Sequence, residues 1–196
     1  GTPNVVNSCC SIKEITASKT LWSIHVFCGS YLPDWRPGRD YRETSSARKS
    51  SGGVLMDLSH ELDYIQWLVG PLKVKHVTSK KVSNLEIESD DLLLLTASTQ
   101  DNVQVQLGLN YFTRASNRQI NVDGEGVSIR GDLIANTLNI ILNGKTSKHT
   151  WPGLERNTTY QALHQAVLDG DQSYICSFDQ GLETVRLIDR IRIWPK

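Results

Sequence analysis

The sequence has little of several features that would place it in a specialised class. Its 196 residues hold only one methionine, three phenylalanines and four cysteines, and its 21 basic side chains are balanced by 21 acidic ones. A net charge of zero argues against a nucleic-acid binder, which needs excess positive charge to displace counterions from phosphates. No run approaches the ~18 apolar residues of a membrane span, and the start has no signal-peptide pattern. We therefore expect a cytoplasmic protein that binds neither nucleic acid nor membranes.

The cysteines predict free thiols. Cys9 and Cys10 are adjacent, which suits a disulfide poorly, and neither they nor Cys28 and Cys176 form the C-x-x-C spacing typical of zinc sites. Scattered reduced thiols are typical of cytoplasmic proteins.

The chain starts with Gly1, and its one methionine, Met56, lies well inside it. We therefore expect a piece cut from, or processed out of, a longer protein. Residues 1–20 have weak periodicity and are expected to be a remnant of an upstream domain or a linker. Residues 21–196 are long enough to bury one sizeable core and are expected to form the domain itself.

Alternating apolar residues predict strands in this domain, and apolar residues at helical spacing predict helices. The expected strands are Leu21–Cys28, Leu72–Thr78, Leu92–Ser98, Val103–Tyr111, Gln119–Asp123, Val127–Arg130, Leu138–Leu142 and Lys145–Trp151. The expected helices are Val54–Val69, Thr158–Leu168 and Phe178–Ile191, the last capped by Ser177. Consecutive strands joined by tight turns pair antiparallel. The fold class is therefore α+β, with a predominantly antiparallel open β-sheet and helices packed on one face.

Two details of the strand pattern are specific. The first strand places Trp22, Ile24, Val26 and Cys28 on one buried face. The dipeptide Asn143-Gly144 between two strands is the strongest short hairpin signal in the chain.

A long polar segment, residues 29–53, separates the first strand from the first helix. Loops of this length are uncommon unless they have a function or are disordered. This one carries Trp35, Arg36, Arg39, Tyr41 and Arg42. Guanidinium groups bind carboxylates or phosphates through paired hydrogen bonds, and aromatic faces stack on sugars, so we predict that these five side chains bind substrate. The alternative is ordinary surface decoration.

The first helix carries the strongest cluster of chemical groups. Asp57, His60, Glu61 and Tyr64 stand at positions i, i+3, i+4 and i+7 and are expected to share one face, pointing away from the leucine stripe and toward the long loop. An imidazole there can exchange protons near neutral pH, and the helix dipole favours an anionic Asp57. A solvated polar face with a chance histidine is the alternative.

Several standard motifs are absent. His60-Glu61 begins the H-E-x-x-H zinc pattern, but Tyr64 stands where the second histidine is needed, so no metal is expected. Gly124-Glu125-Gly126 lacks the third glycine of a dinucleotide-binding turn and leads into a strand. A hydrolase that uses Asp57 and Glu61 is a third hypothesis, although their spacing places both carboxylates on one helix.

The segments Gly29–Arg42, Gly52–Asp63, Trp67–Gly70 and Val122–Val127, with the closing helices, resemble the C-terminal domain of the glucose–fructose oxidoreductase/inositol dehydrogenase/MocA (Gfo/Idh/MocA) family. The resemblance covers residues 21–196, and the His-Glu-Leu-Asp stretch after a glycine pair is its most specific part. It implies a whole protein in which a Rossmann domain, absent from this chain, binds NAD or NADP.

The resemblance also implies the reaction: a hydride moves between nicotinamide and a hydroxyl-bearing carbon of a sugar, sugar derivative or cyclitol. His60 would take the hydroxyl proton, Asp57 would orient the substrate or the imidazole, and Glu61 would contact the substrate. The family often spaces its aspartate four residues before the histidine, whereas here the spacing is three. No cofactor is expected in the isolated domain, which is expected to be inactive.

A non-catalytic binding or oligomerisation module on the same fold is the second hypothesis. Gln104, Gln106 and Asn110 form a polar, uncharged strand face, which suits contact with another subunit. We expect a homo-oligomer that forms through the open face of the sheet.

Overall fold

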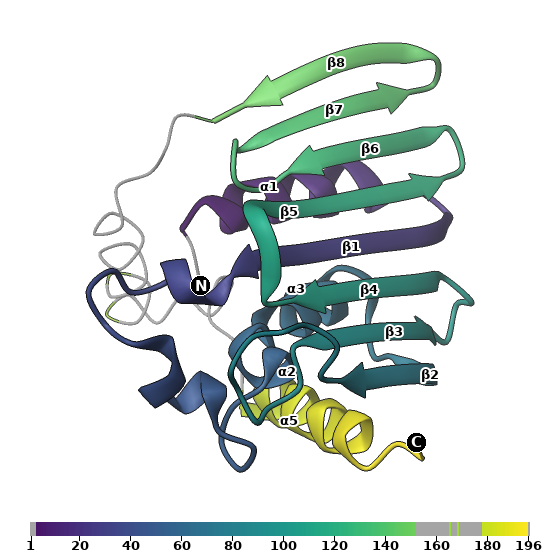
Figure 1. Ribbon diagram of the computed structural model, residues 1–196. Helices are drawn as coiled ribbons and strands as arrows, with labels where there is room; N and C mark the ends of the chain where they lie inside the picture. Colours follow the sequence, from purple (N-terminus) through teal and green to yellow (C-terminus); the bar gives the residue numbers. More distant parts are fainter. Residues whose placement is uncertain (1–2, 152–164, 166–167, 169–177, 196) are drawn as a thin grey trace.

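The computed structural model describes residues 3–151, 165, 168 and 178–195. Figure 1 shows the described part as one sheet with helices behind it. Its helices are α1 (Pro3–Thr16), α2 (Val54–Asp57), α3 (His60–Val69) and α5 (Phe178–Arg192), and short 3₁₀ helices lie at Leu32–Asp34, Tyr41–Glu43 and Ser45–Ala47. Its strands are β1 (Leu21–Tyr31), β2 (Lys73–Lys80), β3 (Leu92–Ser98), β4 (Gln104–Asn110), β5 (Phe112–Gly124), β6 (Val127–Asp132), β7 (Thr137–Leu142) and β8 (Lys145–Thr150).

The eight strands form one sheet in the order β2-β3-β4-β1-β5-β6-β7-β8. Strand β1 lies between β4 and β5, parallel to β4 and antiparallel to β5, and the other neighbours are antiparallel. The expected α+β class with a predominantly antiparallel open sheet is confirmed. Because β1 and β4 are parallel neighbours, their carboxyl ends meet at the same edge of the sheet (Figure 1).

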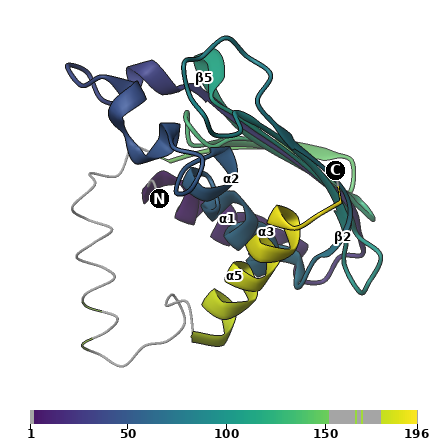
Figure 2. The same cartoon turned by 60° about the horizontal axis from the view of Figure 1, so that its bottom comes forward.

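The helices cover one face of the sheet and leave the other open (Figure 2). Ile24, Val26 and Cys28 of β1 are buried on the covered side, whereas His25 is exposed on the open side. Trp22 was predicted on the buried face, but 59% of it is exposed. It stands at the start of β1, where the pairing with β5 shifts register, and this irregularity explains the difference.

The hairpin predictions from turn residues are confirmed. Asn143 and Gly144 both have positive φ, 48° and 79°, and connect β7 to β8. This is the backbone that a two-residue type I′ turn requires. Glu125 and Gly126 also connect two neighbouring strands, β5 and β6, but only Gly126 has positive φ, 66°, so the Gly-Glu-Gly sequence is a hairpin with a different turn.

Some element boundaries differ from the predictions, and the segment expected to be a remnant or a linker contains a helix. The helix predicted at Val54–Val69 is two helices, because the backbone leaves helical angles at Leu58 (φ −108°, ψ 21°). Residues 3–16, in the predicted remnant or linker, form α1, which packs against α3 and β6. Strand β5 starts at Phe112 rather than Gln119, because its first half is polar and gave no alternating signal.

Some predicted features lie outside the described residues. They include the helix cap Ser177, the thiol of Cys176 and all of the helix predicted at Thr158–Leu168 except Gln165 and Leu168. Among the helices of the described residues, none has the length and apolar content needed to cross a membrane.

The turn that leads into α2 is tightly packed against the preceding loop. The amide N–H of Gly52 donates to the carbonyl of Arg48, and that of Gly53 donates to the carbonyl of Ser46. A Cβ at position 52 would lie 2.3 Å from the carbonyl oxygens of Ser45 and Ser46. The space that Gly52 leaves open is therefore filled by the chain's own backbone.

We expect Gly52→Ala to lower the free energy of unfolding by about 2–3 kcal/mol, because two backbone carbonyls must move to admit the methyl group. Gly38→Ala is the matched control. Gly38 lies in an exposed loop and has positive φ, and a Cβ there meets no atom within 4 Å, so only backbone strain of about 1 kcal/mol is expected. Urea denaturation measures both changes. Equal losses in the two variants would contradict the tight packing of Gly52.

Candidate functional site

The candidate site begins at the first residue of α3. His60 occupies this position, and 36% of its side chain is exposed. Its Nε2 atom lies 3.0 Å from Oε1 of the adjacent Glu61. The imidazole is therefore reachable from outside while one of its nitrogens is held against a carboxylate.

Glu61 itself is completely buried, and its carboxylate has three partners. Nη2 of Arg118, on β5, lies 2.5 Å from Oε1. The hydroxyl of Tyr64, one turn further along α3, donates to Oε2 over 2.7 Å. The Glu61–Arg118 pair therefore joins α3 to the sheet beneath it.

The sheet explains why an ion pair forms there. Arg118 has the same alternation as Ile120 and Val122, so it points to the covered face, and only 9% of it is exposed. Its paired residue on the neighbouring strand β1 is Cys28, which cannot neutralise the charge of Arg118. A buried arginine needs an anion, because an unpaired charge in the interior costs several kcal/mol. Glu61 supplies that anion.

The electrostatics of the cluster favour a charged Glu61. Burial acts to raise the pKa of this carboxyl, but His60, Arg118 and Tyr64 outweigh burial and lower the pKa below its usual value. Burial raises the pKa of the Cys9 thiol and that of the Cys28 thiol to about 12. Both thiols are therefore protonated near neutral pH.

The free-thiol prediction can be checked for three cysteines. Cys9, Cys10 and Cys28 are free, as predicted. Cys176 lies outside the described residues.

The prediction that the four polar side chains of the first helix share one face is wrong. Asp57 lies in α2, His60 starts α3, and Glu61 and Tyr64 point into the core rather than toward the long loop. The break at Leu58 ends the regular spacing on which the prediction relied. The sequence contains only a weak signal, because Arg118 stands two residues before the apolar alternation of Ile120 and Val122 and shares its face.

Asp57 is tied to the end of β4. The hydroxyl of Tyr111, a fully buried residue, donates to Oδ2 of Asp57 over 2.6 Å. Burial and the Asp57 carboxylate both raise the pKa of Tyr111, which keeps the hydroxyl as a donor. The ring of Trp35 packs edge-on against Tyr111 at 5.4 Å, and its Nε1 donates to Oγ of Ser30. From the sequence, Tyr111 was predicted only as the last residue of a strand and not as a residue of the site.

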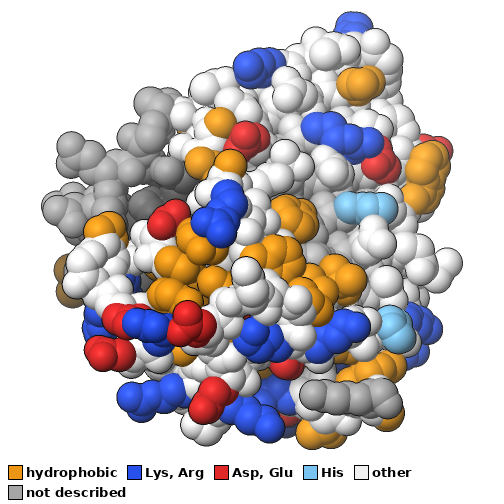
Figure 3. All heavy atoms as spheres, in the orientation of Figure 1, with side chains coloured by type: hydrophobic (Ala, Val, Ile, Leu, Met, Phe, Trp, Pro, Cys, Tyr) orange, Lys and Arg blue, Asp and Glu red, His pale blue; other side chains and the backbone are white. Residues whose placement is uncertain are grey.

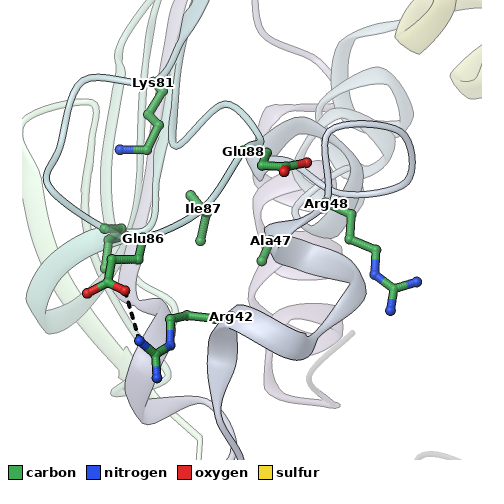
Figure 4. A pocket seen from close by; sticks show the side chains of 8 residues that line it. Arg42, Ala47, Arg48, Lys81, Glu86, Ile87 and Glu88 are labelled. Carbon is green, nitrogen blue, oxygen red and sulfur yellow. Dashed lines mark hydrogen bonds and ion pairs between the residues drawn. The ribbon is translucent and has the colours of Figure 1, made fainter.

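The five predicted loop residues divide between two hollows. Arg42 pairs with Asp40 at 2.7 Å and with Glu86 at 2.8 Å, and it lines a hollow of about 730 Å³ (Figure 4). The other residues of that hollow are Ala47, Arg48, Lys81, Leu85, Glu86, Ile87 and Glu88. The second hollow is small and is lined by Leu32, Pro33, Trp35, Arg36, Arg39, Tyr41, Thr44 and Ser46.

Neither of these two hollows is lined by Asp57 or His60. The loop residues and the imidazole therefore do not line a common hollow among these two. Substrate binding by Trp35, Arg36, Arg39, Tyr41 and Arg42 stays a prediction. Within the described part of the chain, no group of three or more His, Cys, Asp or Glu side chains is placed to hold a metal ion.

Comparison with known proteins identifies the family. Residues 11–192 match the sequence model described as "Oxidoreductase family, C-terminal alpha/beta domain", which is the C-terminal domain of Gfo/Idh/MocA proteins. The match covers most of the chain, and the chain belongs to this family. Among curated protein sequences, none matches it.

Solved structures share the fold at low sequence identity. Levoglucosan dehydrogenase in complex with NADH matches 96% of this chain with a TM-score of 0.76 and 16% identity. An oxidoreductase from Agrobacterium radiobacter, in complex with NAD⁺, L-tartaric acid and magnesium, matches 96% with a TM-score of 0.75 and 15% identity. Aldose-aldose oxidoreductase from Caulobacter crescentus, complexed with glycerol, matches 98% with a TM-score of 0.74 and 18% identity. This chain spans 60%, 58% and 58% of their respective lengths.

The buried ion pair leads to a prediction about stability. We expect Arg118→Met to lower the free energy of unfolding near neutral pH by about 3–5 kcal/mol, because Glu61 stays buried without its counter-charge. Arg130→Met is the matched control, since Arg130 pairs with Asp123 at 3.1 Å but half of its side chain is exposed. Its loss should not exceed about 1 kcal/mol. Urea denaturation compares the two variants.

The same variant has a pH signature. The pKa of Glu61 is lower in the folded protein than the usual 4.5, so its contribution to stability is complete above that value and is lost as the pH falls through the lowered pKa. Without Arg118 the main counter-charge is gone, and the decline in melting temperature from about pH 6 to about pH 3 should be smaller than in the wild type. An equally steep decline would contradict the pairing.

Proposed function

We propose that this chain is the substrate-side domain of a cytoplasmic NAD(P)-dependent dehydrogenase. Its reaction moves a hydride between nicotinamide and a hydroxyl-bearing carbon of a sugar, sugar derivative or cyclitol. The observation that carries the proposal is the partly exposed imidazole of His60 at the start of α3, close in sequence to the anchored carboxylate of Asp57. Membership of the family and structural relatives that hold NAD⁺ or NADH support it.

The nicotinamide cofactor would be held by a domain outside these residues. The Gly-Glu-Gly sequence is the β5–β6 hairpin, so within the described part of the chain it offers no dinucleotide-binding turn. The chain spans about three fifths of its structural relatives, which leaves room in the whole protein for such a domain. When bound, the nicotinamide accepts or returns the hydride.

The residues of this chain would manage the proton and the substrate. His60 takes the hydroxyl proton as the carbon is oxidised, a role that typically contributes about 10²–10⁴ in rate. Asp57, held by Tyr111, orients the substrate or the imidazole. The long loop contributes substrate contacts, and the second domain supplies the facing wall. The chain alone is therefore expected to be inactive.

His60→Ala tests this role in the complete protein. We expect kcat to fall about 10²–10⁴-fold, because the proton acceptor is lost, with little change in melting temperature. Reduction of NAD⁺ or NADP⁺ is followed by absorbance, with levoglucosan, myo-inositol, D-glucose and UDP-N-acetylglucosamine as probe substrates. His149→Ala is the matched control, because His149 is exposed on β8, and should keep wild-type turnover. Unchanged turnover in His60→Ala would favour the non-catalytic module.

A second proposal concerns assembly, and the open face of the sheet supports it. Apolar and histidine side chains lie together on this face (Figure 3). Leu94 of β3 is 49% exposed, and it lines a hollow of about 450 Å³ with Phe27, His25 and His76. We propose that a second copy of the chain covers this surface, since exposed apolar patches typically mark interfaces.

The polar residues expected in this interface are only partly on the surface. Gln104 and Gln106 are exposed on the open face. Asn110 is buried, and its Oδ1 accepts hydrogen bonds from the amide N–H groups of Phe112 and Thr113. The expectation for Asn110 is therefore wrong, because its side chain closes the turn between β4 and β5.

Leu94→Glu tests the assembly. We expect it to shift the chain from dimer to monomer in sedimentation velocity at micromolar concentration, because a desolvated charge at the centre of an interface is unfavourable. Val185→Glu is the matched control, since Val185 is 53% exposed on α5, behind the sheet, and should leave the dimer intact. A wild-type chain that is monomeric throughout this range would contradict the proposal.

A further inference from the structure

We propose that Glu61 is a positioning residue for His60, held in place by Arg118, and not a group that contacts substrate. The inference rests on the proposed function, in which His60 exchanges a proton with the substrate. It replaces the expectation that Glu61 binds substrate, and it assigns Arg118 a part in the site that the sequence pattern did not indicate.

The first argument is accessibility. Glu61 has no exposed surface, whereas a third of the adjacent His60 side chain is exposed. Arg118 lies on one side of the carboxylate and Tyr64 on another. A substrate can therefore reach the imidazole without reaching the carboxylate.

The second argument is the fixed direction of the carboxylate. Arg118 and His60 both contact Oε1, while Tyr64 donates to Oε2. Oε2 accepts a hydrogen bond, and Oε1 lies in close ionic contact with Arg118 and His60, so the carboxylate cannot turn without losing one of these contacts. Arg118 comes from β5, so the direction is set by the sheet and not only by the helix that carries His60.

The consequence for His60 is that its two nitrogens differ. Nε2 faces a charged carboxylate at 3.0 Å, so the neutral ring keeps its proton there. Nδ1 is then the unprotonated nitrogen and the atom that accepts the substrate's proton. The imidazolium formed in that step is stabilised by the same carboxylate, as in other sites where a buried acid orients a catalytic histidine.

The competing explanation is that the ion pair only stabilises the fold. Two variants distinguish this structural role from the positioning of His60. Glu61→Gln removes the charge but keeps an acceptor for the Tyr64 hydroxyl. Because it strands Arg118 as a buried charge, it is expected to lower the melting temperature. The double variant E61Q/R118M removes the stranded charge as well and should regain most of that loss.

The activity of the complete protein then decides between the two roles. If Glu61 positions His60, both variants lose kcat by about 10–100-fold, a part of the usual contribution of acid–base catalysis, although the double variant is stable. Asp63→Asn is the matched control, since Asp63 is an exposed carboxylate on the same helix, and should retain wild-type kcat. A stable double variant with wild-type kcat would overturn the proposal.

A spectroscopic measurement on this chain needs no substrate. Ring N–H protons of exposed histidines exchange rapidly with water, so an Nε2 proton shielded by the buried Glu61 carboxylate 3.0 Å away should give a ¹⁵N-coupled resonance that disappears in E61Q/R118M and in His60→Ala. Its absence from the wild-type spectrum would also overturn the proposal. Failure of the proposed function looks different: His60→Ala would keep turnover while this resonance remained present in the wild type.

Discussion

The ion pair between Glu61 and Arg118 is the constraint on which the site depends. The sheet points an arginine into its covered face, and a carboxylate from the helix above pairs with it. That pairing fixes where the first turn of α3 lies on β5. It also leaves His60, the residue before Glu61, at the boundary between core and solvent. A rule about buried charge thus determines the placement of the candidate catalytic imidazole.

A second tie holds the preceding residues at the same edge of the sheet. Strands β1 and β4 are parallel neighbours, and the amide of Leu32, after β1, donates to the carbonyl of Tyr111, after β4. Tyr111 in turn holds Asp57, and Trp35 packs on the Tyr111 ring. The long loop and helix α2 are therefore held by contacts that meet where these strands end.

Local signals predicted most of the fold, and long-range pairing explains the rest. The Asn143-Gly144 hairpin and β3 at Leu92–Ser98 follow from turn chemistry and from short apolar runs, which act over a few residues. The insertion of β1 between β4 and β5 has no local signal. The site shows the same division: His60 was predicted from the pattern of its own helix and stays a prediction, whereas Glu61 was placed on the wrong face because its burial depends on Arg118, 57 positions further along the chain.

The most direct test of this account is a crystal structure of the complete protein with NAD⁺ and a substrate that it oxidises. The account requires Nδ1 of His60 to lie within about 3 Å of the reacting hydroxyl while Nε2 stays against an enclosed Glu61. A reacting hydroxyl held by another side chain, with the imidazole turned to solvent or Glu61 in contact with the substrate, would contradict it.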